Sequence, residues 1–292
     1  MKTILAATDF SAWAHYALER AAQLARASGA ELHLLHVPRH GLWSQGTGMF
    51  SQYFGDGNSP SVEGDRARLE QAAAALSRRF RVKAQCHVVP GKPADEIATF
   101  ASAREADLVV LANRGQGGLR PAAVGGTALK VLWRSLAPVL MVRQPTEGAY
   151  RKALLATDLT ERSLHVGRTV CAMLPKASIT LVHAFRGEHE TALELMGADR
   201  DALGRYRADR GVEAAAGLKA YWAEVRGTGR RRAAEYLAHG HPVPAVIEAV
   251  SELAPDLVVF GKHAGARWQE QVLGSVVQNL AQQLETDVLV IP

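Results

Sequence analysis

The amino-acid sequence predicts two tandem α/β domains, each a doubly wound, five-stranded parallel sheet with helices on both faces. Three observations support this fold class. The chain repeats itself at a nearly constant spacing, each copy alternates short apolar runs with Ala- and Leu-rich stretches, and both copies carry a Gly-rich loop after the fourth apolar run. At 292 residues the chain is long enough for two domains of ordinary size.

The duplication is recognised by its offset. Residues 5–11 (LAATDFS) match residues 154–160 (LLATDLT), so that equivalent positions lie 149 residues apart (158 − 9). One constant offset is hard to obtain by chance, and we therefore expect one domain over residues 1–146 and a second over 150–292. Three further segments match at the same offset: 89–93 with 238–242, 106–110 with 255–259, and 138–142 with 287–291.

The first elements follow from local patterns. The apolar run Thr3–Ala7 predicts a strand. Ser11–Ala27 is rich in Ala, Leu and Arg and stops at Gly29, which predicts a helix with a C-terminal glycine. Glu31–Val37, closed by Pro38, predicts the second strand. At this strand the offset slips to 147 residues, as the matched pair His36 and His183 shows (183 − 36).

The middle of the first copy contains a long connection and three more elements. Residues 41–64 are rich in Gly, Ser and aromatic residues and predict a loop. Asp65–Arg79 predicts a helix and Arg81–Val89 an alternating strand. Pro93 suits the first turn of another helix. The continuous apolar run Asp107–Ala112 predicts a buried, parallel strand.

The last elements are a helix over Thr127–Ser135 and a strand over Pro138–Val142, and the second copy follows the same order. For the aromatic loop of the first copy and the helical Tyr206–Trp222 region of the second, we favour packing or domain contact over a lid or a partner surface. The alternation implies a Rossmann-like or flavodoxin-like sheet, in which ligands bind beyond the carboxyl ends of the strands.

Each first strand ends in Thr-Asp, at Asp9 and at Asp158. A carboxylate at this position can accept hydrogen bonds from an adenine amine or a ribose hydroxyl. It can equally cap the following helix. The two roles are not exclusive, and both stay open on the sequence.

Each fourth strand ends in a Gly-rich turn that suits an anion. In the second copy Gly261-Lys262-His263-Ala264 is followed by nine residues and then Gly274-Ser275. Glycine at the strand exit removes the Cβ that would block a ligand, and a Gly-Ser pair before a helix offers backbone N–H groups and the positive helix end. Nearby positive charge comes from Lys262, His263 and Arg267, or from Arg114 and Arg120 in the first copy. The alternative is an ordinary loop with a helix cap.

This set of motifs resembles the universal stress protein family. Its nucleotide-binding members carry a Gly, two residues, a Gly, nine residues and then Gly-Ser or Gly-Thr, together with an Asp just after the first strand. The resemblance covers the whole chain as a tandem form, including a Gly-x-Pro before the third helix and a Pro-Val-Leu-type last strand.

The resemblance implies ATP or ADP as the ligand, with a divalent ion as a companion of the nucleotide. In the second copy it implies that Asp158 contacts adenosine and that the backbone of Ala184 hydrogen-bonds the adenine. The other implied contacts line or close the phosphate site: Gly261, His263, Ala264, Gly274, Ser275 and Val276. The matching positions of the first copy are Asp9, Val37, Ala112, Arg114, Gly115, Gly125, Gly126 and Thr127.

Neither copy matches the family pattern in full. The first has Ala112 where the first Gly belongs and Gly126 where Ser or Thr belongs. The second has Ala264 for the second Gly but keeps Gly274-Ser275. We therefore expect the second copy to bind nucleotide better than the first.

The family's subunits commonly pair through their last strands, so the resemblance also implies a pseudo-dimer within the chain, paired through Pro138–Val142 and Asp287–Ile291. That pairing would bury two sheet edges. A further homodimer of the whole chain stays open.

Composition limits the other classes. The chain is 48% hydrophobic and 22% charged, which excludes a disordered protein. A net charge of +5 suits phosphates but is too diffuse to indicate nucleic acid. No apolar run approaches a membrane span, and the N-terminus lacks the apolar stretch of a secretory signal, so a cytoplasmic protein without membrane contact is expected.

Neither metal nor catalytic motifs stand out. Cys86 and Cys171 read as small buried side chains, and the closest histidine pair, His239 and His241, lacks a third ligand. No P-loop lysine motif, dinucleotide fingerprint or Ser/His/Asp set is present. We expect a stress-response or signalling module that binds adenine nucleotide with little or no turnover. Two alternatives stay open: a scaffold with degenerate sites, and a slow ATPase that uses Asp158 and a divalent ion.

Overall fold

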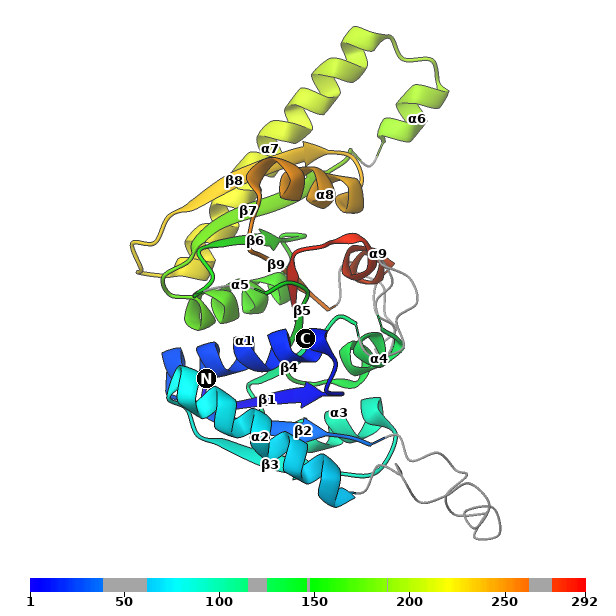
Figure 1. The fold of residues 1–292 in the computed structure, drawn as a ribbon. Helices are drawn as coiled ribbons and strands as arrows, with labels where there is room; N and C mark the ends of the chain where they lie inside the picture. The colour runs from blue at the N-terminus through cyan, green and yellow to red at the C-terminus, as the bar shows by residue number, and fades with distance from the viewer. Residues whose placement is uncertain (39–61, 115–124, 146–147, 188, 263–274) are drawn as a thin grey trace, which may run out of the picture. The chain divides into compact units, whose positions relative to one another are not determined.

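The computed structural model describes residues 1–38, 62–114, 125–145, 148–187, 189–262 and 275–292. The chain divides into two compact units, Met1–Ala149 and Tyr150–Pro292, and each is described by itself. The alternation of strands and helices expected from the sequence is present in both units (Figure 1).

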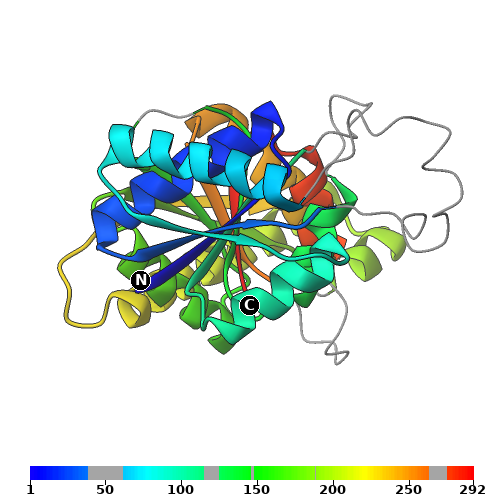
Figure 2. The same ribbon diagram turned by 60° about the horizontal axis from the view of Figure 1, so that its bottom comes forward.

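The first unit is a parallel sheet in the order β3-β2-β1-β4-β5. Helices α1 and α2 pack on one face, while α3 and α4 pack together on the other (Figure 2). This is the doubly wound arrangement that the sequence predicts. The elements are β1 (Thr3–Thr8), α1 (Ala12–Ser28), β2 (Glu31–His36), α2 (Val62–Phe80), β3 (Ala84–Val88), α3 (Pro93–Ala103), β4 (Leu108–Ala112), α4 (Gly126–Arg134) and β5 (Val139–Val142).

The second unit repeats the plan, with a parallel sheet in the order β10-β9-β6-β7-β8. Helices α5 and α7 pack together, as do α8 and α9. The elements are β6 (Lys152–Ala156), α5 (Glu161–Met173), β7 (Ser178–Phe185), α6 (Glu190–Leu195), α7 (Arg200–Arg226), β8 (Ala233–His239), α8 (Pro242–Leu253), β9 (Leu257–Gly261), α9 (Ser275–Gln283) and β10 (Asp287–Ile291).

The amino ends of the central strands are held by one carboxylate in each unit. Asp107 accepts the backbone N–H groups of Lys2 and Thr3, the latter at 3.0 Å. Asp256, 149 residues later, accepts the N–H groups of Arg151 and Lys152 at 2.7 and 3.0 Å. The duplication seen in the sequence is therefore also a duplication of hydrogen bonds.

Helix boundaries follow the capping residues. Ser11 and Thr160 cap α1 and α5 through side chains that accept N–H groups at 3.1 and 3.4 Å. Gly29 ends α1 with a left-handed φ of 69°, a conformation that costs glycine little. Pro93 and Pro242 open α3 and α8, where a missing N–H has no consequence.

Two boundaries in the first unit differ from the expectation by three residues, and the other predicted boundaries of that unit differ by at most one residue. Helix α2 begins at Val62 rather than Asp65. Strand β3 begins at Ala84 rather than Arg81, because Arg81 takes a left-handed φ of 55° directly after the helix and cannot continue into an extended strand. The aromatic loop at 41–64 falls largely outside the described residues.

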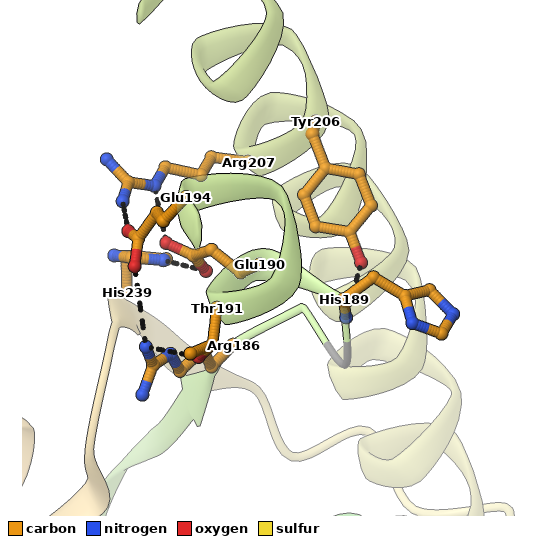
Figure 3. A network of polar contacts seen from close by, with 8 residues as sticks. All are labelled: Arg186, His189, Glu190, Thr191, Glu194, Tyr206, Arg207 and His239. Carbon is orange, nitrogen blue, oxygen red and sulfur yellow. Dashed lines mark hydrogen bonds and ion pairs between the residues drawn. The ribbon is translucent and has the colours of Figure 1, made fainter. Parts of the chain in front are cut away.

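In the second unit the helical region around Tyr206–Trp222 is longer than expected. Helix α7 runs for 27 residues and is preceded by the short α6, which the sequence did not predict. Tyr221 and Trp222 are buried, in agreement with the packing role that we favoured for this region. Tyr206 lies further out, against α6 (Figure 3).

The two cysteines are free and half-buried, and burial raises the pKa of each thiol. Among the described residues, no helix is both long and apolar enough to cross a membrane. The expected pairing of the last strands of the two copies stays a prediction, as does a homodimer.

Candidate functional site

A cavity of about 620 Å³ opens at the carboxyl ends of the second unit's strands. This volume lies within the roughly 300–1,000 Å³ typical of small-molecule sites. Its described wall is mostly apolar, with polar groups gathered on β6, β7, α5 and the exit of β9. The lining residues are Ala156, Thr157, Asp158, Arg162, Ser163, His165, Val166, Val182, His183, Ala184, Pro242, Val246, Phe260, Gly261, Lys262, Val276, Val277, Leu280, Ile291 and Pro292.

Asp158 lies in a tight turn between β6 and α5. Its Oδ1 accepts the N–H of Thr160 at 3.1 Å and the Thr160 hydroxyl at 2.7 Å. Thr160, not Asp158, is the N-cap of α5. The sequence left two roles open for Asp158. Capping of α5 is performed by Thr160, while Asp158 orders the turn and lines the cavity.

The wall beside β7 is set by a histidine. His183 donates from Nδ1 to the carbonyl oxygen of Thr157 at 2.9 Å, because a carbonyl can only accept. This bond ties the end of β7 to the end of β6. His183 and the following Ala184, the residue predicted to meet an adenine ring, both line the cavity.

The exit of β9 contributes Gly261 and Lys262. A Cβ at Gly261 would come within 3.2 Å of Val166, so glycine keeps this wall open. Lys262 donates its backbone N–H to Ile291 at 2.7 Å, and the residue lines the cavity. Burial lowers the pKa of the Lys262 ammonium group.

Helix α9 forms another part of the cavity wall. It begins at Ser275, which is exposed, and Val276 and Val277 from its first turn line the cavity. His263, Ala264 and Gly274 lie outside the described residues. The structure therefore gathers Asp158, Ala184, Gly261 and Val276 around one cavity, with Ser275 adjoining Val276.

The predicted residues of the first unit lie at the equivalent strand ends. Asp9 accepts the N–H of Ser11 at 3.0 Å, and Val37 is buried directly after β2. Gly125 donates its N–H to Asn113 at 2.8 Å and precedes Gly126 and Thr127 at the start of α4. The guanidinium of Arg114 lies 5.1 Å from the ring of Trp13. Gly115 is outside the described residues.

In the first unit, the histidine equivalent to His183 is His36, and neighbouring side chains cover it. His36 donates from Nδ1 to Thr8 at 2.8 Å, as His183 does to Thr157. Its ring, however, lies 4.3 Å from that of Phe10, and its Nε2 lies 3.5 Å from the carboxylate of Asp65 on α2. Because both His36 and Asp65 are buried, this side of the first unit is filled by its own side chains.

The sequence reasoning missed Arg162 and His165, which line the cavity from α5. Their positions in the sequence could have identified them as lining residues. They are three residues apart, near the start of the helix that follows the first strand, so they share one face directed at the strand ends.

The two histidines His239 and His241, which lie close together in the sequence, have structural partners. His239 contacts Glu190 at 2.8 Å in the cluster drawn in Figure 3, and His241 accepts the N–H of Val243 at 3.3 Å as the cap of α8. Within the described ranges, no group of three or more His, Cys, Asp and Glu side chains could hold a metal ion.

Comparisons with known proteins agree with the duplication. The sequence model of the universal stress protein family matches this chain twice, at residues 1–143 and 149–292. Universal stress protein YxiE of Bacillus subtilis is 32% identical over 144 residues, which are 48% of this chain and 97% of that protein.

Two solved structures align with the chain over nearly its whole length. A universal stress protein from Archaeoglobus fulgidus covers 99% of this chain and 97% of its own, with a TM-score of 0.64 at 15% identity. A functionally unknown protein from Pseudomonas aeruginosa PAO1 covers 100% and 92%, with a TM-score of 0.66 at 18% identity. At these identities the likeness concerns the fold.

Proposed function

This chain belongs to the universal stress protein family, and we propose that its second domain binds an adenine nucleotide, ATP or ADP, as a signalling module with little or no turnover. The observation that carries the proposal is the 620 Å³ cavity, because it lies at the carboxyl ends of the strands and is lined by four residues singled out from the sequence alone. They are Asp158, Ala184, Gly261 and Val276.

The chemistry of the wall suits such a ligand. The apolar side chains, among them Val182, Val246 and Leu280, offer a surface for a purine ring. The carboxylate of Asp158, which lines the cavity, can accept a hydrogen bond from a ribose hydroxyl. Arg162 and Lys262 supply positive charge for phosphates. A divalent ion would accompany the nucleotide through its phosphates rather than occupy a cluster of protein ligands.

The first domain is proposed to bind nucleotide more weakly. Ala112 stands where the second domain has Gly261, and the ring of Phe10 together with Asp65 covers His36. His36 and Asp65 are buried and Phe10 is half-buried, so making room for a ligand there costs packing energy.

The test is a binding measurement on the full chain with one matched pair of variants. We expect about one adenine nucleotide per chain in acid-denatured protein and heat on titration of ATP into stripped protein. Asp158→Asn keeps an acceptor for Thr160 but loses the charge, and it should weaken ATP binding by ~10-fold. Asp9→Asn, the same change in the first domain, should leave the affinity within about twofold.

Two results would overturn the proposal. Stripped protein that gives no heat at millimolar ATP, and that copurifies with no nucleotide, would favour a nucleotide-independent scaffold. Phosphate release above background that disappears in Asp158→Ala would instead identify a slow ATPase.

A further inference from the structure

The rim of the second domain's cavity is basic where the first domain is uncharged or aromatic. The duplication allows a position-by-position comparison, because equivalent residues in these segments lie 149 apart. Three of the lining positions differ in this way. The pairs, first domain and then second, are Trp13 and Arg162, Tyr16 and His165, and Asn113 and Lys262.

The last pair is held by equivalent backbone hydrogen bonds. Asn113 follows β4 and donates its N–H to Val142 at 2.9 Å, while Lys262 follows β9 and donates its N–H to Ile291 at 2.7 Å. Val142 and Ile291 are themselves matched last residues of their strands. Only the side chain therefore distinguishes the two positions.

These two side chains meet different surroundings. Lys262 lines the cavity and is half-buried, and burial lowers the pKa of its ammonium group. An anion in the cavity would recover part of that lost solvation. Asn113 is 3% exposed, and its Oδ1 has no hydrogen-bond partner in the part of the chain that the structure describes. It carries no charge that could attract a phosphate.

The helix that follows the first strand shows the same contrast. Arg162 lies in the first turn of α5 and lines the cavity. Its counterpart Trp13 lies in the first turn of α1, with its ring 6.0 Å from that of Tyr16. Arg162 lies in α5 and Lys262 directly follows β9, so the two basic residues that line the cavity come from separate parts of the chain.

We propose that Lys262, assisted by Arg162, makes the second domain select the phosphates of its nucleotide, so that ATP and ADP bind in preference to adenosine. This selectivity rests on the proposed nucleotide site but goes beyond it. The first domain has Asn113 and Trp13 at the same positions, and its nearby cation, the guanidinium of Arg114, lies 5.1 Å from the Trp13 ring. We therefore expect a smaller preference for phosphates there. Lys262 is thus a specificity-determining residue, and its contribution increases with the charge of the ligand.

The experiment compares ATP, ADP and adenosine by calorimetric titration into the stripped full chain. Lys262→Asn places the first domain's residue in the second domain. It should weaken ATP binding by ~10-fold or more, the loss expected for one charge-assisted contact, and change adenosine binding by less than about twofold. Lys262→Arg keeps the charge and should recover most of the ATP affinity.

Lys152→Asn is the matched control, since it removes one positive charge at the opposite, amino end of β6. It should leave the ratio of ATP to adenosine affinity unchanged. A ratio that stays at the wild-type value in Lys262→Asn would overturn the inference while leaving the nucleotide site intact. Equal losses for ATP and adenosine would assign Lys262 a purely structural part and would also overturn it. Wild-type protein that binds neither ligand would refute the proposed function itself.

Discussion

At the scale of single residues, the turn after each first strand is the feature that the two copies share most closely. Phe10 and Leu159 both take a left-handed φ, of 61° and 62°, which is uncommon for such side chains. Each donates its N–H to the threonine two residues earlier, at 3.0 and 3.1 Å. The turn fixes the direction in which the neighbouring aspartate points, so both copies hold a carboxylate at the strand end.

A second residue-scale feature is a pair of histidines in the first domain. His33 Nδ1 and His87 Nε2 lie 3.1 Å apart, so one ring donates to the other. Burial lowers the pKa of His33, and the charge of Arg104 adds to this. Burial also lowers the pKa of His87, assisted by His33, Arg104 and Arg66. The folded protein therefore favours the neutral pair.

The first prediction follows from the sign of those shifts. Because the folded pKa values lie below the ordinary 6.5, the stability that the neutral pair contributes is fully present above pH 6.5 and is lost as the pH falls from 6.5 through the lower folded pKa values. Urea unfolding of the full chain should show a lower midpoint at pH 5.0 than at pH 7.5, and the broken hydrogen bond alone is worth about 1 kcal/mol.

Replacing both histidines by asparagine should shrink this pH dependence, whereas His15→Asn on the exposed side of α1 should preserve it. An unchanged difference between the two pH values in the double variant would contradict the prediction.

At the scale of elements, α5 and α7 pack closely because α5 has a glycine at the contact. A Cβ at Gly167 would lie 2.6 Å from Val225 and 2.7 Å from the Tyr221 hydroxyl. That hydroxyl donates to Ser163 at 2.7 Å, and burial raises the pKa of Tyr221 to about 12. The contact supports the first turn of α5, from which Arg162 reaches the cavity.

The second prediction is a pair of glycine substitutions with opposite signs. Gly167→Ala should destabilise the second domain by about 1–3 kcal/mol, because the added methyl overpacks the contact. Gly204→Ala, in the part of α7 where a Cβ meets nothing, should stabilise the helix by up to about 1 kcal/mol. Thermal unfolding followed by circular dichroism measures both, and a shift of the same sign in the two variants would refute the argument.

The short helix α6 is attached by charges rather than by an apolar face (Figure 3). Glu190 is 1% exposed and accepts Arg207 Nε at 2.6 Å, with His239 at 2.8 Å on its other oxygen. Burial alone would raise the pKa of Glu190, but the hydrogen bonds from His239 and Arg207 hold it below its ordinary value. Glu190 therefore links α6 to α7 and to the end of β8.

The third prediction is that Glu190→Ala releases α6. Loss of two charge-assisted hydrogen bonds should cost about 2 kcal/mol locally, and amide hydrogen exchange across residues 190–195 should rise accordingly. Glu194→Ala breaks the outer contact of Arg207 at 2.9 Å, where both partners are substantially exposed, and should cost less than about 1 kcal/mol. Equal exchange in the two variants would show that Glu190 does not anchor the helix.

At the scale of the whole molecule, the chain is two copies of one plan whose site-bearing segments have diverged. The backbone bonds at the strand ends agree between the copies, but the side chains near them do not. The first copy fills the space beside His36 with Phe10 and Asp65, while the second has a cavity beside His183. We therefore expect the proposed nucleotide to bind and stabilise mainly the second domain.

The fourth prediction is unequal stabilisation by ligand. ATP at about 100 times its dissociation constant should stabilise the domain that binds it by about 2.7 kcal/mol. Amide exchange should slow in β6, β7 and β9 of the second domain and stay unchanged in β1, β2 and β4 of the first. Equal protection of both sets of strands would mean that both domains bind ATP with similar affinity.

The sequence by itself determined the duplication, the order of strands and helices and the strand ends at which Asp158, Ala184 and Gly261 lie. These features depend on local patterns and on a repeat offset, which can be read without knowledge of distant contacts. Element ends moved by a few residues where a single backbone angle decided them, as at Arg81.

Only the tertiary structure decided which side chains surround the cavity. Arg162 and His165 join Lys262 because α5 begins beside the strand ends, and His36 is covered because α2 brings Asp65 to it. Contacts of this kind link residues from separate elements. They depend on how the helices pack on the sheet, which no local pattern in the sequence encodes.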